Sequence, residues 1–108
     1  MLYTELTINE NTYKLRLNTR SLITLEKRIG CNPLMIFGAT GDVVPTITTM
    51  VDILFVALQE YQHGIGLEDA YKIFDSYLDA GNSASDFIFV IMEIYKASGL
   101  IGNKTEKN

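Results

Sequence analysis

The stretch LYTELTINENTYKLRL, residues 2–17, decides the fold, because apolar and polar residues alternate in it on both sides of an Asn-rich turn. Such alternation places neighbouring side chains on opposite faces of a strand. The stretch therefore predicts a β-hairpin with its turn at residues 9–12 and one aliphatic face. Glu5 can then pair with Lys14 or Arg16 across the strands. A lone hairpin is only marginally stable in water, so this face has to pack on helices or on another chain.

After this stretch the apolar spacing changes to the helical period. Asn18 or Thr19 can cap a helix that stops at Gly30, and Pro33 begins a short helical turn. Further helices are predicted at residues 45–61, at residues 67–80, and from a cap at Ser83 or Ser85 to about residue 96. The helix at 45–61 is apolar almost all round, which is typical of a central helix. The expected fold class is α+β, mainly α, with an N-terminal hairpin, four main helices and a short helical turn.

The predicted core is built from the apolar stripes of these helices. Among its expected members are Leu22, Ile23, Leu25, Leu34, Ile36, Ile47, Met50, Val51, Leu54, Leu58, Ala70, Tyr71, Phe74, Tyr77, Leu78, Phe87, Ile91, Ile94 and Tyr95. Phe89 and Met92 lie off the last stripe, near Lys96. A small protein that leaves such residues outside its core usually has a partner, so Phe89 and Met92 are candidate interaction residues.

Composition limits the chain to one domain, expected at residues 1–100 with a flexible tail at 101–108. Hydrophobic residues make up 47% of the 108 residues and charged residues 20%, which excludes a disordered chain. A single cysteine excludes an internal disulfide framework. Acidic residues interrupt every apolar stretch before it is long enough to cross a bilayer, and the first 13 residues do not resemble a signal peptide. We therefore expect a soluble cytoplasmic protein without membrane contact.

Charge is unevenly distributed along the chain. The net charge is +2 over residues 1–30, -8 over residues 31–95 and +2 over residues 96–108. The acidic balance argues against nucleic-acid binding, which needs clustered Lys and Arg. An acidic surface can simply keep a protein soluble. Alternatively, a basic end of one subunit meets an acidic face of another, which makes interaction candidates of Lys14, Arg16, Arg20, Asp75 and Asp79.

Candidates for catalysis are weak. His63, the only histidine, lies beside Gly64 at a predicted helix end, where a polar residue is common, and Cys31 lies in a turn without a second cysteine. Asp75 and Asp79 are four residues apart on one helix, but a metal site needs more ligands. The sequence therefore indicates no catalytic, cofactor-binding or metal-binding residues.

The order of short motifs resembles the tail assembly chaperones of long-tailed phages and prophages of Gram-positive bacteria. The motifs are residues 13–17 (YKLRL), 18–22 (NTRSL), 25–27 (LEK), 32–34 (NPL), 58–64 (LQEYQHG), 77–81 (YLDAG), 86–88 (DFI) and 95–100 (YKASGL). The resemblance covers roughly residues 3–100 and concerns packing and capping patterns. The family has no catalytic or ligand residues to carry over.

The resemblance implies a protein of the host cytoplasm that coats the tape measure protein, helps to recruit tail tube subunits and is absent from the mature virion. It also implies self-association, and a chain ending at residue 108 would be the short form of a pair made by frameshifting. Two alternatives remain open. One is a small helical adaptor or regulatory protein, and the other is a minor structural head–tail component of a phage.

Overall fold

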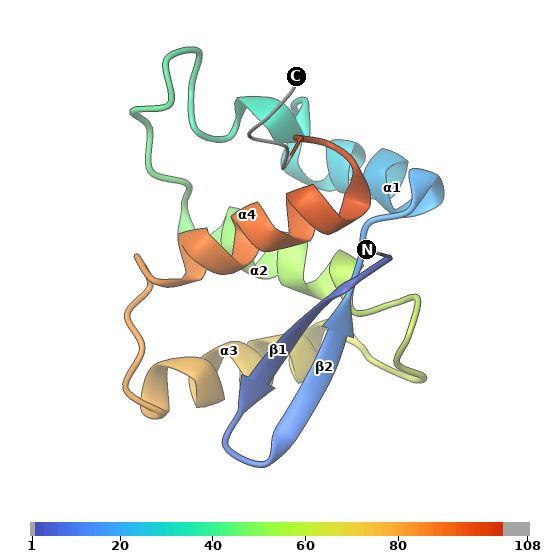
Figure 1. The fold of residues 1–108 in the computed structure, drawn as a ribbon, viewed down its shortest axis with the longest axis vertical. Coiled ribbons are helices and arrows are strands. Elements are labelled where there is room, and N and C mark those ends of the chain that lie inside the picture. Colours follow the sequence, from blue (N-terminus) through green and yellow to red (C-terminus); the bar gives the residue numbers. More distant parts are fainter. Residues whose placement is uncertain (1, 103–108) are drawn as a thin grey trace.

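The computed structural model describes residues 2–102, in which a hairpin is followed by four helices and one 3-10 turn (Figure 1). The elements are β1 (Thr4–Ile8), β2 (Asn11–Leu15), α1 (Thr19–Ile29), η1 (Pro33–Met35), α2 (Ile47–Ala57), α3 (Leu67–Asp79) and α4 (Phe87–Ser98). The predicted fold class, α+β and mainly α, is confirmed. No helix within residues 2–102 has both the length and the apolar character that a membrane crossing requires.

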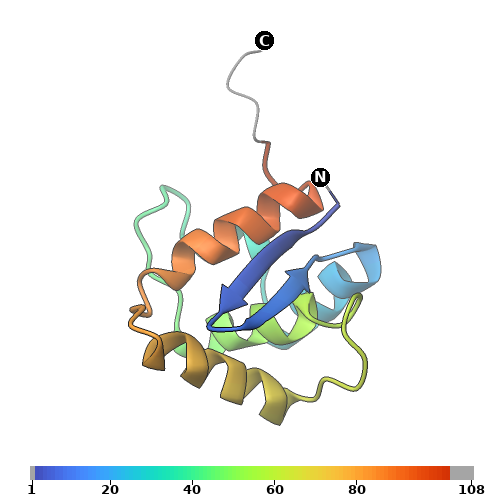
Figure 2. The same cartoon turned by 60° about the horizontal axis from the view of Figure 1, so that its bottom comes forward.

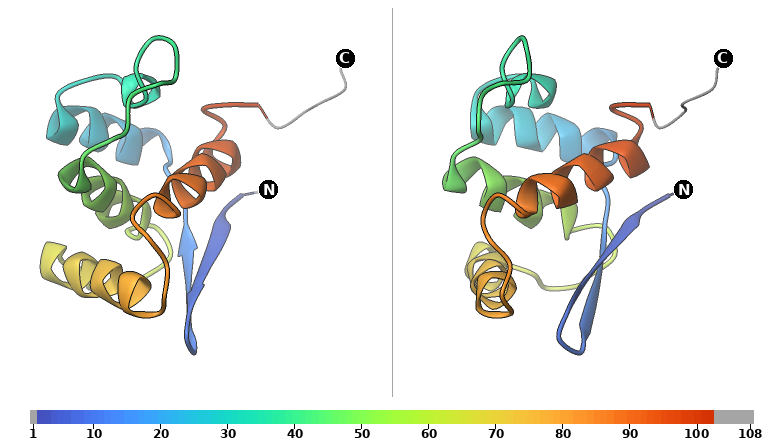
Figure 3. Two further views of the ribbon diagram at one scale, coloured as in Figure 1. Left: turned by 90° about the vertical axis from the view of Figure 1, so that its left-hand side faces the viewer. Right: turned by 60° about the vertical axis from the view of Figure 1, so that its left-hand side comes forward.

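The helices and the hairpin form two layers. α1, α2 and α3 lie side by side with α2 in the middle, and α4 and the hairpin cover one face of this layer (Figures 1 and 3). α2 contacts each of the other three α-helices, as expected for a helix that is apolar almost all round. Figure 2 shows the hairpin lying beside α4, so the first and last elements of the chain are neighbours in space.

The hairpin has the predicted strand pairing but a tighter turn. β1 and β2 are antiparallel, and Glu5 lies opposite Lys14, as expected. Ile8 pairs with Asn11, so the turn is Asn9 and Glu10 alone, and the prediction of a turn over residues 9–12 was too long. Asn9 has a φ of 55°, a left-handed conformation that asparagine adopts more readily than most residues. The expected aliphatic face packs on the helices through Leu6, Ile8, Leu15 and Leu17.

The outer edge of β2 is closed at Lys14 by a side chain from the segment that follows α2. The backbone N–H of Lys14 donates to Oε1 of Gln62 at 2.9 Å, and Nε2 of Gln62 donates to the Lys14 carbonyl at 2.9 Å. One amide side chain thus pairs with Lys14 as a neighbouring strand would. Further along, the N–H of Arg16 donates to the Ala57 carbonyl at 3.1 Å. These bonds anchor the hairpin to the end of α2.

We expect the change Gln62→Ala to lower the free energy of unfolding by about 1–2 kcal/mol. The variant loses both bonds to Lys14 and the bond from Nε2 to the Leu58 carbonyl, but the freed groups are near solvent, which limits the cost. Urea denaturation measures the difference. Gln59→Ala is the matched control, because the Gln59 side chain bonds to the carbonyls of Phe55 in α2 and Ile65 after it but to no group of the hairpin, and it should leave hydrogen exchange at the Lys14 amide unchanged. Fast exchange of that amide in the wild type would contradict this account.

The predicted ends of α1 are confirmed, whereas the helix predicted at residues 45–61 is shorter and runs as α2 from Ile47 to Ala57. Oδ1 of Asn18 accepts from the N–H of Ser21 at 2.8 Å and begins α1, which ends at Gly30 with a left-handed φ of 74°. Ser83 and Asp86 bond reciprocally ahead of α4, each side chain accepting from the backbone N–H of the other. The N-cap of α4 is nevertheless Asp86, so the prediction that Ser83 or Ser85 caps this helix was wrong, and Ser83 acts in the turn that precedes it.

The core differs from the prediction at five positions. Ile23, Leu34, Ile47, Tyr71 and Leu78 were expected inside and are exposed. α3 buries a single narrow stripe on α2, formed by Ala70, Ile73, Phe74 and Tyr77, so that Tyr71 and Leu78 are turned toward solvent. Ile23 lies beside the Leu25 stripe of α1, Leu34 lies in the single turn of η1, and Ile47 is the first residue of α2. Short elements pack through fewer residues than a helical stripe suggests.

The end of α4 is tied to distant parts of the chain. The hydroxyl of Tyr95 donates to the Pro33 carbonyl at 2.8 Å, and Oγ of Ser98 accepts from the N–H of Leu17 at 2.8 Å. Burial, with a smaller contribution from Cys31, raises the pKa of Tyr95 well above its ordinary value. Ile101, expected in a flexible tail, is half-buried against the core, and the rest of that prediction concerns residues 103–108, which lie outside the described residues.

Candidate protein-binding surface

A groove between α2 and α3, here called the α2–α3 groove, lies near the start of α2. It has a volume of about 260 Å³. Its apolar lining consists of Ile47, Val51, Tyr71 and Phe74, and its charged lining consists of Asp52 and Asp75. It exists because α3 packs on α2 through one narrow stripe, which leaves the flanks of both helices apart near the start of α2.

The rim of the α2–α3 groove is apolar and exposed. Ile47 is 50% exposed and Tyr71 is 43% exposed, although both belong to helices that carry the core. Val43 and Val44, in the loop that leads into α2, are exposed as well but do not line the groove. Large apolar side chains gathered around a concave surface are a common sign of a binding site for another protein. The groove can therefore hold an apolar side chain of a partner.

The two carboxylates of the groove differ in their surroundings. Oδ1 of Asp52 accepts from Nε of Arg28 at 3.0 Å and from Nη2 at 2.8 Å, and the Asp52 side chain is only 12% exposed. The guanidinium of Arg28 also lies 5.0 Å from the ring centre of Phe55. Asp75 is exposed and forms no ion pair within the described residues. Asp52 is therefore neutralised by Arg28, and Asp75 leaves the groove with a negative charge.

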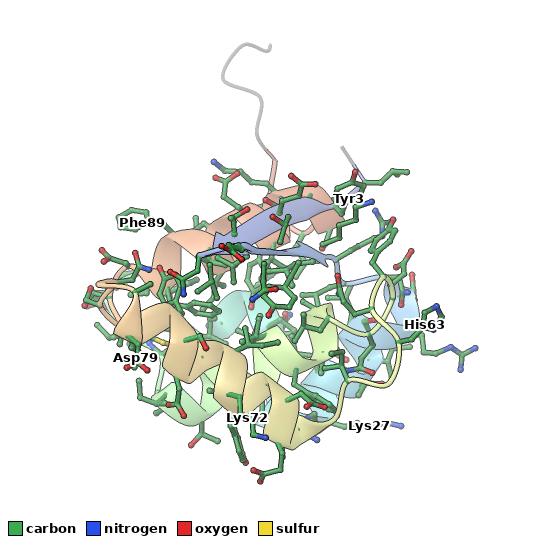
Figure 4. The ribbon with its side chains drawn as sticks, turned by 90° about the horizontal axis from the view of Figure 1, so that it is seen from below. Tyr3, Lys27, His63, Lys72, Asp79 and Phe89 are labelled. Atoms are coloured by element: carbon green, nitrogen blue, oxygen red, sulfur yellow. The ribbon has the colours of Figure 1, made fainter. Side chains whose placement is uncertain are left out.

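Phe89 and Met92 were predicted to lie outside the core. Phe89 is 71% exposed on α4, and Figure 4 shows its ring projecting away from the ribbon. Met92 is half-buried. Phe89 also lines a small hollow between β1 and α4, away from the α2–α3 groove. Their role as interaction residues stays a prediction.

The three basic candidates are used differently by the fold. Nζ of Lys14 lies 4.9 Å from the ring centre of Tyr3. Nε of Arg16 lies 3.6 Å from Oε1 of Glu60, and Nη1 of Arg16 donates to the Leu2 carbonyl at 2.6 Å. Arg20 is exposed on α1 and forms no ion pair within residues 2–102. Arg20 is therefore the most available of the three for a contact with another molecule.

The acidic candidates share the outer face of α3. Asp75 and Asp79 are exposed there, and Asp75 is the member that belongs to the groove. Figure 4 shows Asp79 and Phe89 on one side of the molecule and His63 and Lys27 on the other. His63 and Cys31 are both exposed. Within the described part of the chain, no three residues of the His, Cys, Asp and Glu types cluster closely enough to hold a metal ion.

Sequence reasoning missed the α2–α3 groove, because it placed Ile47 and Tyr71 in the core. One signal was available in the sequence. Asp52 is the only charged residue between Ile47 and Leu58, and a carboxylate in such an apolar helix needs a partner. That requirement points to a cation on the facing helix, where Arg28 lies. The exposure of the apolar rim depends on how α3 is placed against α2, which a helical period does not encode.

One comparison with known proteins gives a match. The model of a family of unknown function, DUF6096, matches residues 4–108. No curated protein and no solved structure matches the chain significantly. The matched region starts at the first residue of β1 and includes all four helices, so the α2–α3 groove and the hairpin both lie within it.

Proposed function

We propose that this chain, which belongs to the DUF6096 family of unknown function, is a non-catalytic phage tail assembly chaperone that binds the tape measure protein and helps to recruit tail tube subunits. Two lines of argument support the proposal. The sequence motifs resemble those of such chaperones, and the molecule exposes the α2–α3 groove with its apolar rim. The groove is the observation that carries a binding function, because it offers both concave shape and unpartnered apolar area.

The chemistry of the groove suggests how a partner is held. An amphipathic helix can bury its apolar face in such a groove, with specificity set by the charges at the rim. Ile47 and Tyr71 would contact apolar residues of the partner, and Asp75 would attract a basic residue next to them. A tape measure protein is long and largely helical, so many of its turns could be bound in this way. Coating of this kind belongs in the host cytoplasm, before the virion is complete.

We expect the double change Ile47→Glu and Tyr71→Glu to abolish binding to the tape measure protein. Carboxylates at both rim positions would have to be desolvated next to Asp75 when a helix docks, which should weaken binding at least 100-fold. Co-expression of each variant with the tape measure protein of the proposed phage or prophage, followed by measurement of the soluble fraction, checks this. The control is Ile23→Glu with Leu34→Glu, which places the same charges on exposed apolar residues outside the groove.

The tape measure protein could instead stay soluble with the groove variant and become insoluble with the control. That result would place the binding site around Ile23 and Leu34, outside the groove. If the tape measure protein stays insoluble even with the wild-type chain, the proposed chaperone function is wrong. Circular dichroism has to show that both variants are folded. Since all four substituted residues are exposed, the fold should tolerate each change.

The alternatives predict different behaviour. A small adaptor or regulatory protein would bind one partner and form no extended assembly. A minor structural head–tail component would remain in purified particles. Self-association through Arg20 of one subunit and Asp75 or Asp79 of another remains part of the proposal, and a contact of this kind would weaken as salt screens the charges.

A further inference from the structure

The two outer edges of the hairpin are treated differently by the rest of the molecule. In an antiparallel pair, every second residue directs its N–H and C=O away from the partner strand. On β2 the outward groups belong to Thr12 and Lys14; those of Lys14 bond to Gln62, and those of Thr12 form no hydrogen bond within residues 2–102. On β1 they belong to Glu5 and Thr7, and within the same residues no hydrogen bond joins these backbone groups to any other group. The edge of β1 is therefore open at both outward residues, whereas that of β2 is closed at Lys14.

The open edge has neither a proline nor a bulge, and its one charged side chain is that of Glu5. Monomeric proteins protect such edges with proline, bulges or charged side chains, lysine above all. β1 is a regular five-residue strand, and its outward-facing side chains are those of Glu5 and Thr7. Figure 3 shows β1 at the side of the molecule, on the outer side of β2. A strand added there would meet unbonded backbone groups.

A hollow of about 180 Å³ lies beside this edge, between β1 and α4. Phe89 and Val90 contribute its apolar part, and Glu5 and Glu93 contribute carboxylates. Two lysines offset these charges: Nζ of Lys96 lies 3.3 Å from Oε2 of Glu93, and Lys14 is the cross-strand neighbour of Glu5, although its Nζ lies over the Tyr3 ring and forms no ion pair with Glu5. The edge therefore carries little net charge, so it would not repel a second edge of the same kind.

We propose that β1 pairs with β1 of a second copy of this chain, antiparallel and about a two-fold axis, to form a four-stranded sheet. In the favoured register, Glu5 lies opposite Thr7 of the partner subunit and Thr7 lies opposite Glu5 of the partner subunit. Each of these pairs supplies two hydrogen bonds, so all the outward groups of both residues are satisfied at once. A register that opposes the two Glu5 side chains is disfavoured by like charge.

A second copy fits this edge better than an unrelated strand. The same residues that need hydrogen bonds on one chain offer them on the other, which is the self-complementarity that a two-fold interface requires. A two-stranded sheet gains stability from additional strands. Phe89 of each copy, which is 71% exposed beside the edge, would be covered by the added strand or by α4 of the partner. The pairing does not depend on what the α2–α3 groove binds.

The test compares Thr7→Pro with Thr12→Pro by sedimentation equilibrium. Proline at Thr7 removes an N–H that faces the proposed partner, and proline at Thr12 removes one that faces outward on β2. Both variants also lose the same hydrogen bond, which joins the Thr7 and Thr12 hydroxyls at 2.9 Å. At high salt, which screens the proposed contacts of Arg20, we expect the wild type and Thr12→Pro to be dimers, and Thr7→Pro to dissociate at least 100-fold more readily.

Three results would overturn this interface. They are a wild type that stays monomeric at hundreds of micromolar, equal weakening by both prolines, and a dimer indifferent to Thr7→Pro. If neither proline variant folds, hydrogen exchange on the wild type decides instead. The Glu5 and Thr7 amides should become protected as concentration rises while the Thr12 amide does not. Phe89→Ser should weaken the dimer at least tenfold, whereas Ile23→Ser, also at an exposed apolar position, should leave it intact.

Discussion

Replacement of Phe87 by alanine is expected to lower the free energy of unfolding by about 3–5 kcal/mol. The Phe87 ring is fully buried and meets two other rings edge to face, with centroids 5.2 Å from Phe74 and 5.3 Å from Tyr77. The change leaves a cavity where α3 and α4 meet and removes both aromatic contacts. A chain of this size has about 5–15 kcal/mol of stability, so the variant should lose a large part of it.

The control for this measurement is Phe89→Ala, on the same helix and of the same residue type. Because Phe89 is mostly exposed, its loss should change the free energy of unfolding by about 0.5 kcal/mol or less. Urea denaturation of both variants should be done at a concentration where the midpoint no longer depends on dilution, so that association does not contribute. Equal losses at the two positions would show that α4 packs on the core through a different face.

The change Arg28→Met should lower the free energy of unfolding by about 2 kcal/mol. Methionine keeps much of the apolar stem over Phe55 but removes the cation that pairs with Asp52. The Asp52 side chain is only 12% exposed, so its carboxylate would be left unpaired and mostly buried. A carboxylate in such a place is costly when unpaired. The full cost for a deeply buried pair is not expected, because the Arg28 side chain is 32% exposed.

A double-mutant cycle separates this pair from simple packing. Asp52→Asn keeps the shape of the side chain and removes its charge, so it should cost less than Arg28→Met. With both changes present, the loss should be smaller than the sum of the single losses by about 1 kcal/mol or more. If the single losses are simply additive, Arg28 and Asp52 are not coupled, and the charge of the α2–α3 groove has to be reassigned.

Local patterns predicted the elements of this fold well. The alternation around Asn9, the cap at Asn18 and the stop at Gly30 are all decided by neighbours in sequence, and all are present in the structure. The central position of α2 also followed from its composition. These features depend on backbone geometry and on the number of apolar residues around one helix, and both can be read from the sequence.

Contacts between elements could not be predicted in the same way. A helical period shows which residues share a face, but it does not show how much of that face a short neighbour covers. Ile47 and Tyr71 illustrate this, since both lie on apolar stripes and both end at the rim of the groove. The closing of the β2 edge by Gln62 depends on a segment 48 residues away, for which no local signal exists.

The packing of the hairpin beside α4 has a consequence for synthesis of the chain. β1 and β2 leave the ribosome before α4. Yet α4 covers part of their aliphatic face, and its Ser98 hydroxyl oxygen accepts a hydrogen bond from the N–H of Leu17. Until α4 emerges, the hairpin lacks its packing surface, and its strands are open to wrong pairings. A nascent chain halted after α3 would carry this vulnerable state for as long as translation pauses.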